Sequence, residues 1–450
     1  MLALVASLTS AFPARAQDTI NGNISNGVNT IRIAVANFKP LASDPESAAY
    51  KQTFDATLYA DLASAGIFDI VSKSLMPPTM PGAPSEIQLP TYASAPANAA
   101  MVAFGSLGVV GNKLVVNGFL FDAKNLQYPQ VLARQYSEDP TDDSARQVAH
   151  RFADEIIYRL GGGTPGIAET KIFYVKINPG KDNTGTKEIW EMDYDGANQH
   201  AITHLGTVSM SPHVSPDNTR VAFESLGRNG FQIKMYSLIL GRLVNFPEIG
   251  GTNITPTWSP DGRELAYSSS RTGDPEIWIS DASGNLARRV TNFRGPDMSP
   301  VYNPRTGAQI AWISGRTGLP QLYIMNTDSS SPQRLSGDGK GNPEGYATSP
   351  SWSPDGKFIA FAWDRKYGPG APGGQDIYVI DVATGEWKQL THDGGRCDFP
   401  SWSPDSRHIV YANSADGKAD HTRIWTMLTD GTQRRPLTAA GADMPNWSWK

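Results

Sequence analysis

The sequence has one cysteine, Cys397, so no disulfide can form within the chain and packing alone must hold the fold. It also lacks a basic stripe: 39 Lys and Arg stand against 44 Asp and Glu, a net charge of −5, which argues against nucleic-acid binding. After the first residues, no apolar run approaches the ~20 residues of a membrane helix, so we expect a protein that is not membrane-embedded. What is abundant is turn chemistry: 43 Gly and 33 Pro suit an all-β chain.

Motifs for catalysis and for metal or phosphate binding are missing as well. There is no Gly-x-Ser-x-Gly elbow, and no pair of histidines has the His-Glu-x-x-His spacing. His200 and His204 are four residues apart, but in a strand-loop region this spacing does not bring side chains together. Residues 193–196 lack the remaining acidic ligands of a calcium loop, and the glycines at 161–163 are not followed by Lys-Ser/Thr. We therefore expect no enzyme activity, no cofactor and no metal.

Residues 1–16 have the pattern of an export signal. A short apolar stretch at 2–12 is followed by Ala14-Arg15-Ala16, the small-x-small pattern of a cleavage site, which predicts a mature start at Gln17. No Lys or Arg precedes the apolar stretch. Either the true start lies upstream, or the stretch is a short apolar terminus without meaning.

An aromatic residue or histidine before Ser-Pro-Asp, or a variant of that motif, recurs through the second part of the chain. The copies stand at 213–217, 258–262, 302–305, 352–356, 402–405 and, truncated, 447–449. Pro fixes φ at the first central position of a β-turn and Asp suits the second, so each copy predicts a corner between two strands. Four strand patterns fall in each repeat, and a period of roughly 40–50 residues is typical of propeller blades.

The two ends of this array complement each other. Residues 171–177 match a second strand with no first strand before it, and residues 444–449 match a first strand with nothing after it. Together they make one blade, which closes a ring of six and removes the exposed edges. The alternatives are an open stack or a β-sandwich. Closure predicts that Trp447 lies beside the strand at Phe173.

The first part of the chain, residues 17–165, predicts a small α/β domain ahead of the propeller of residues 166–450. Residues 31–38 form a strand, a helix begins at Asp44-Pro45 and ends near Gly66, and a second strand follows at 68–71, as in a βαβ-like unit.

The remainder of this domain is predicted from three strands and one helix. The Pro-rich stretch 77–96 is expected to be loop. Residues 101–110, 113–121 and 130–136 predict an antiparallel sheet, and Thr141 caps a second helix that carries an apolar face.

With these features in this order, the sequence resembles the TolB family of the Tol-Pal system. The resemblance rests on the domain that opens with IRIAVANF at 31–38, the junction GIAETKIFYV at 166–175, and six blades that end on the last inner strand. It implies an all-β six-bladed β-propeller at the C-terminus with a small N-terminal α/β domain. It also implies a monomeric, periplasmic, non-enzymatic protein that acts in outer-membrane integrity and cell division.

The resemblance further implies two protein partners. TolA, an inner-membrane protein, would bind residues 17–29, which are polar and weakly ordered by themselves, through Asp18, Ile20, Ile24 and Val28. The peptidoglycan-associated lipoprotein Pal would bind one mouth of the propeller, formed by the loops that enter each inner strand. The matching positions are Met210, His213, Asn253, Thr255, Asp297, Met298, Tyr346, Thr348, Asp398, Phe399 and Met444.

Two other functions stay open at this point. One is a secreted propeller with sugar-binding or enzymatic activity in its channel, and the other is an accessory domain of a separate peptidase. The Trp and Tyr residues recur at fixed blade positions, which favours a core role over a sugar site. A pull-down from periplasm that recovers a Pal-type lipoprotein would favour the Tol-Pal scaffold over these two alternatives.

Overall fold

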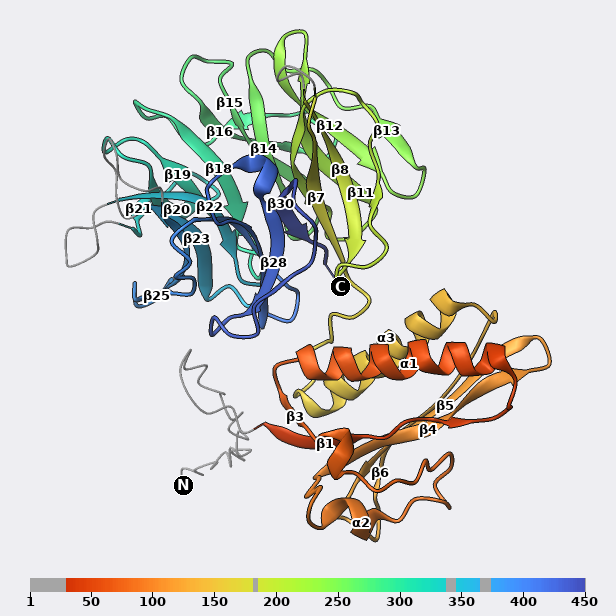
Figure 1. The fold of residues 1–450 in the computed structure, drawn as a ribbon. Helices are drawn as coiled ribbons and strands as arrows, with labels where there is room; N and C mark the ends of the chain where they lie inside the picture. Colours follow the sequence, from red (N-terminus) through yellow and green to blue (C-terminus); the bar gives the residue numbers. More distant parts are fainter. Residues whose placement is uncertain (1–29, 181–184, 337–344, 365–373, 450) are drawn as a thin grey trace, which may run out of the picture.

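The computed structural model describes residues 30–180, 185–336, 345–364 and 374–449. Figure 1 shows two domains, an α/β domain at the N-terminal end and a β-propeller made from the rest of the chain. Within the described ranges, no helix is both long and apolar enough to cross a membrane. The expected signal and the strand at 17–29, with Asp18, Ile20, Ile24 and Val28, lie outside these ranges.

The N-terminal domain is built on one mixed sheet of order β3-β1-β4-β5-β6. β1 pairs in parallel with β3 and β4, which confirms the βαβ-like unit, and β4, β5 and β6 are antiparallel as expected. The short strand β2 pairs with β4. The bounds are β1 (Ile31–Val35), β2 (Lys39–Pro40), β3 (Phe68–Ile70), β4 (Met101–Val110), β5 (Lys113–Asp122) and β6 (Gln130–Glu138).

Two long helices, α1 (Pro45–Ser64) and α3 (Asp142–Leu160), cover the face of this sheet that turns toward the propeller (Figure 1). Both predicted caps are confirmed. The Asp44 carboxylate accepts from the backbone N–H of Ser47 at 2.7 Å, and the Thr141 hydroxyl accepts from that of Ser144 at 3.0 Å.

The other face of the sheet is covered by the Pro-rich stretch. The prediction of loop throughout 77–96 was wrong at one place, because α2 (Leu89–Ala93) forms there. Leu89 and Tyr92 of this short helix are buried against Phe104 and Phe121 of the sheet. Burial of two apolar side chains stabilises a helix too short to persist alone.

The propeller has six four-stranded blades, in which each inner strand lies next to the channel. The two sheets of blades 5 and 6 are joined by a single parallel bridge between Gln375 and Arg396. From inner to outer strand the blades are: blade 1, β30 (Ala442–Trp447), β7 (Lys171–Asn178), β8 (Thr186–Asp193), β9 (His200–Ala201); blade 2, β10 (Ser209–Val214), β11 (Arg220–Gly227), β12 (Gly230–Ser237), β13 (Arg242–Val244); blade 3, β14 (Asn253–Trp258), β15 (Glu264–Ser269), β16 (Glu276–Asp281), β17 (Arg288–Arg289); blade 4, β18 (Asp297–Tyr302), β19 (Gln309–Ser314), β20 (Gln321–Asn326), β21 (Gln333–Arg334); blade 5, β22 (Tyr346–Trp352), β23 (Phe358–Asp364), β24 (Gln375–Asp381), β25 (Trp387–Gln389); blade 6, β26 (Arg396–Trp402), β27 (His408–Ser414), β28 (Arg423–Leu428), β29 (Arg435–Pro436).

The closure of the ring is confirmed. β30 pairs antiparallel with β7, with Asn446 opposite Phe173 and Trp447 opposite Ile172. The Trp447 indole N–H donates to the Thr170 hydroxyl at 2.8 Å. Blade 1 is therefore assembled from both ends of the propeller sequence, and β7 has a paired strand on each side instead of a free edge toward the channel.

The Ser-Pro-Asp corners are held by their own side chains. In blade 2 the Ser215 hydroxyl donates to Asp217 at 2.6 Å and accepts from the backbone N–H of Arg220 at 3.0 Å. The same pattern joins Ser259 to Asp261 and Ser353 to Asp355. The motif therefore recurs because Ser and Asp satisfy turn amides that the strands leave unpaired.

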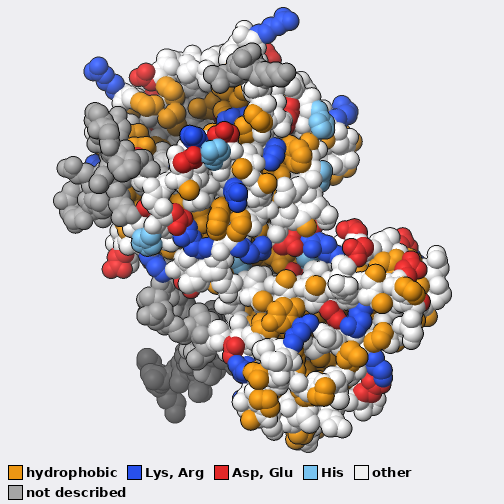
Figure 2. Space-filling model, viewed as in Figure 1, with side chains coloured by type: hydrophobic (Ala, Val, Ile, Leu, Met, Phe, Trp, Pro, Cys, Tyr) orange, Lys and Arg blue, Asp and Glu red, His pale blue; other side chains and the backbone are white. Residues whose placement is uncertain are grey.

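The two domains meet through polar groups, and Figure 2 shows basic and acidic side chains gathered along their junction. The buried Asp61 of α1 accepts a hydrogen bond from Tyr194, in the β8–β9 turn, and lies 2.7 Å from His150 Nδ1 of α3. Arg146 of α3 bonds Asp195 of the same turn at 2.6 Å. Burial raises the pKa of Asp61, and the hydrogen bonds from His150 and Tyr194 oppose that rise.

A second contact between the domains contains a buried carboxylate, Asp405, whose protonation should destabilise the protein in acid. His408 Nε2 lies 2.7 Å from the Ser64 carbonyl of α1, and its Nδ1 lies 3.1 Å from buried Asp405. Burial alone would raise the pKa of Asp405, but His408 and Arg407 lower it well below its ordinary value. A carboxyl whose pKa is depressed on folding stabilises the fold above its unfolded pKa, near 4, and loses that contribution as the pH falls toward the folded pKa.

We therefore expect Asp405→Asn to lower the free energy of unfolding at pH 7 by on the order of 2 kcal/mol and to flatten its decline between about pH 4 and 2. Urea titrations over this pH range measure both effects. Asp355→Asn, at the same corner of blade 5 with a more exposed carboxylate, is the control and should change the profile little. Parallel pH profiles for wild type and Asp405→Asn would contradict the assignment.

Candidate protein-binding site at the propeller mouth

Each of the six inner strands is interrupted by a bulge at the same position. Strand register shifts there, and in every blade the shift contains a non-glycine residue with φ near +50° followed by proline. The six pairs are Ser211-Pro212, Thr255-Pro256, Ser299-Pro300, Ser349-Pro350, Phe399-Pro400 and Met444-Pro445. Such left-handed backbone in non-glycine residues is strained and gathers at functional sites.

The six bulges surround a hollow of about 130 Å³ at one end of the channel. They lie early in each inner strand, whereas the N-terminal domain contacts the corner after the end of β26, through His408 and Ser64. The hollow therefore opens on the half of the disc away from the N-terminal domain. We call it the mouth.

The structure brings part of the expected site together at the mouth. His213, Thr255, Phe399 and Met444 line the hollow. Outside its lining, another group of the expected residues is half-buried: Met210, Met298, Tyr346 and Thr348. The side chains of the remaining three are buried: Asn253, Asp297 and Asp398.

The buried members of the expected set hold the loops that enter the inner strands. Asn253 donates to Gln232 Oε1 at 3.1 Å and to the carbonyl of Ile249 at 3.0 Å. Asp297 forms an ion pair of 3.2 Å with Arg316. Neither side chain can touch a partner without rearrangement, so their part is to fix the backbone of the mouth.

The sequence reasoning missed Ser211, Ser299 and Ser349, and the proline ring as a whole. The signal was present, because a proline stands two residues before each aromatic or β-branched residue that closes an inner strand. A proline lacks an N–H and marks a bulge or edge within a strand. Its recurrence once per repeat could have identified the bulges.

Charged groups lie beside the mouth. Arg396 reaches Asp398 at 3.4 Å and Asp443 at 3.3 Å, and its guanidinium lies 5.3 Å from the centre of the Phe399 ring. Burial would lower the pKa of Arg396, but the two carboxylates raise it, so the cation is retained. A fixed cation against the face of an aromatic ring helps to orient Phe399 at the opening.

On the blade 2 side, the buried Glu224 holds two of the bulges in place. It accepts from the backbone N–H of Thr255 at 2.8 Å and from the Ser211 hydroxyl at 3.1 Å. Burial raises the pKa of Glu224. These two bonds tie the bulge of blade 2 to that of blade 3, so neighbouring parts of the mouth are held in one arrangement.

Deeper in the channel, side chains join adjacent inner strands around the disc. Four blades each contribute one polar residue that bonds the next blade; the pairs are Ser351 with Trp402, Ser401 with Trp447, Asn446 with Val214, and His213 with Thr257. Burial lowers the pKa of His213 to about 4, so this ring is neutral at pH 7. Val301 occupies the equivalent position of blade 4 and cannot continue the chain of bonds.

The geometry offers no catalytic arrangement among the residues described here. The thiol of Cys397 lies buried in β26, and burial raises its pKa to about 12, so it is not a thiolate at neutral pH. In the same ranges, no group of three or more His, Cys, Asp or Glu side chains is placed to hold a metal ion. What the mouth can do is present a rigid, partly apolar ring to another molecule.

The fold defines a class, that of proteins in which a small α/β domain precedes a six-bladed β-propeller. Residues 158–450 match the family model described as the TolB beta propeller domain, and residues 23–127 match the TolB amino-terminal domain. The chain therefore belongs to the TolB family, the family of the Tol-Pal system.

Individual relatives agree with this assignment. The crystal structure of TolB from Acinetobacter baumannii superposes with a TM-score of 0.76 at 26% identity, over 94% of this chain and 97% of that chain. A protein TolB homolog of Chlorobium luteolum is 30% identical over 279 residues, 61% of this chain. The Tol-Pal system protein TolB of Desulfosudis oleivorans is 32% identical over 191 residues, 42% of this chain. The chain spans 60% and 41% of the length of these two relatives.

Proposed function

We propose that this protein is a non-catalytic periplasmic scaffold that binds a Pal-type lipoprotein at the mouth and a TolA-type inner-membrane protein through residues 17–29. In this role it contributes to outer-membrane integrity and cell division. Membership of the TolB family supports the assignment. The observation that carries it is the ring of six bulges, which hold half-buried side chains around one opening.

The side chains at the mouth suit a protein ligand. Phe399 and Met444 are half-buried in a rigid frame, so a partner can cover their remaining surface at little entropic cost. Aromatic and Met side chains at the centre of an interface carry much of the binding energy. We therefore assign the contact set to His213, Thr255, Phe399 and Met444, with Met210, Met298, Tyr346 and Thr348 at its margin.

Replacement of Phe399 by alanine should weaken binding of the soluble domain of a Pal-type lipoprotein about tenfold, because an aromatic anchor is lost. Calorimetric titration of the purified proteins measures the change. Tyr128→Ala is the matched control: Tyr128, in the N-terminal domain, is 75% exposed and does not line the hollow, so its loss should leave the affinity unchanged. Equal affinities for wild type and Phe399→Ala would move the binding site away from the mouth.

A further inference from the structure

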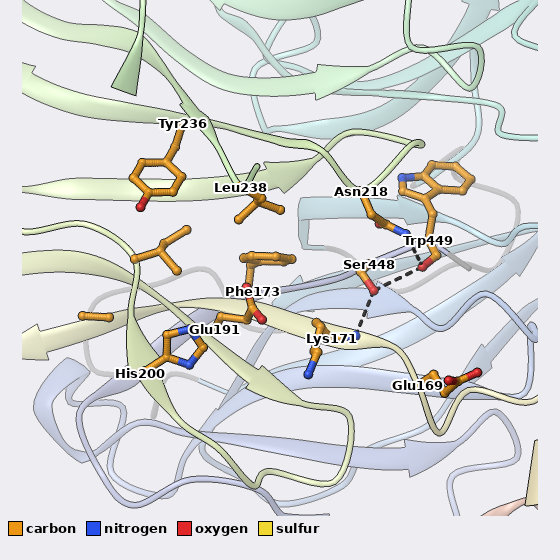
Figure 3. A pocket seen from close by; sticks show the side chains of 12 residues that line it. Glu169, Lys171, Phe173, Glu191, His200, Asn218, Tyr236, Leu238, Ser448 and Trp449 are labelled. Atoms are coloured by element: carbon orange, nitrogen blue, oxygen red, sulfur yellow. Dashed lines mark hydrogen bonds between the residues drawn. The ribbon is translucent and has the colours of Figure 1, made fainter. Parts of the chain in front are cut away.

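A second hollow, of about 480 Å³, lies between blades 1 and 2 and is separate from the mouth. Figure 3 shows its construction. Tyr236 and Leu238 form one wall, Phe173 lies in the middle, and Glu191 and His200 lie on the opposite side. We call this hollow the interblade groove.

The floor and one wall of the interblade groove are apolar. Phe173 and Ile202 are buried beneath it, and Leu238 is half-buried at its edge. The next two residues of the chain, Ile239 and Leu240, are 75% and 57% exposed. An exposed apolar run that adjoins a hollow is typical of an interaction surface.

The opposite wall supplies an unused negative charge. Glu191 is half-buried, and its carboxylate makes no hydrogen bond to the residues that the structure describes. Burial raises its pKa, while His200 and Lys171 oppose the rise. The Lys171 ammonium, however, bonds Asp193 at 2.5 Å, and His200 Nδ1 lies 2.9 Å from the Asn198 carbonyl. A half-buried carboxylate that lacks a hydrogen-bond donor is stabilised when a cationic group donates a hydrogen bond to it.

We propose that the interblade groove binds an extended segment of a partner protein in which a large apolar side chain stands next to Lys or Arg. The apolar side chain would lie above Phe173 and cover Leu238 and Ile239, and the cation would bond Glu191. Residues 17–29 of this chain contain no Lys or Arg, so charge complementarity favours another protein as the source. Because the groove is separate from the mouth, its occupant can be bound together with a ligand there.

The test uses the full-length protein and two fluorescein-labelled peptides, Gly-Ser-Phe-Arg-Ser-Gly and Gly-Ser-Phe-Glu-Ser-Gly, followed by fluorescence anisotropy. The basic peptide should bind, and the acidic one should bind at least about tenfold more weakly. Glu191→Gln, which keeps the shape of the side chain, should weaken the basic peptide about tenfold. Glu386→Gln, which removes the same charge from an exposed turn of blade 5, should not.

A second variant tests the groove without any change at position 191, so the result does not depend on whether Glu191→Gln folds normally. Ile239→Ser alters an exposed side chain and should weaken the basic peptide several-fold with an unchanged unfolding curve. Absence of binding at about 1 mM peptide, or equal binding by wild type and Glu191→Gln, would overturn the proposal. Tighter peptide binding after deletion of residues 17–29 would overturn it too, since the chain's own segment would then be the occupant. Self-association abolished by Leu240→Ser would identify a second copy instead.

Discussion

Replacement of Trp447 by alanine is expected to lower the free energy of unfolding by about 3–5 kcal/mol, the usual cost of deleting a buried large aromatic side chain. Trp447 is 4% exposed and packs in the cluster of Ile172, Tyr174 and Val410. Its removal opens a cavity in the one blade that is built from both ends of the propeller sequence. The loss therefore acts on ring closure as well as on local packing.

Urea denaturation followed by tryptophan fluorescence measures this loss. Trp449→Ala is the matched control, because Trp449 lies two residues further on and is only half-buried. Its replacement should cost less than about 1 kcal/mol. If the two variants lost similar amounts of unfolding free energy, Trp447 would contribute no more to ring closure than a half-buried tryptophan does.

The second large effect is expected at the junction of the domains. Asp61→Ala removes the carboxylate that accepts from Tyr194 and His150, two hydrogen bonds that run between buried groups. Hydrogen bonds to a charged group contribute about 1.5–3 kcal/mol each, and the burial of Asp61 offsets part of this. We expect a net loss of about 3 kcal/mol and separate thermal transitions for the two domains, against a single transition expected for the wild type.

Differential scanning calorimetry resolves the transitions. Of the two hydrogen bonds to Asp61, Tyr194→Phe breaks only the one that crosses the junction. This variant should lose about half as much unfolding free energy as Asp61→Ala, and its two domains should also unfold in separate transitions. His150→Ala affects the other bond, which lies within the N-terminal domain. A single unchanged transition in Asp61→Ala would show that other contacts, such as Arg146 with Asp195, suffice to couple the domains.

The Ser-Pro-Asp repeat and the closure of the propeller ring could be predicted because both depend on local sequence. A Ser-Pro-Asp corner is satisfied by its own side chains, as Ser215 and Asp217 show, so its sequence is recognisable wherever the turn occurs. The complementary ends at Phe173 and Trp447 needed no knowledge of long-range packing beyond the avoidance of free edges.

The junction of the domains could not be predicted in the same way. Asp61, His150 and Tyr194 come from three elements that are distant in sequence, and each alone reads as an ordinary polar residue on a helix or turn. The mouth is an intermediate case. The repeat predicts loops at the start of the inner strands, but the burial of Asn253 and Asp297 depends on packing between blades, which no single repeat reveals.

The assembly of blade 1 also decides how the protein would carry tension. A pull on the N-terminal domain passes along residues 161–170 and enters the disc at β7, where Lys171 is already bonded to Ser448 at 2.9 Å. β7 is flanked by β30 on one side and β8 on the other. Force along its axis is therefore shared by two antiparallel ladders in shear, so the strand would resist being peeled off one bond at a time.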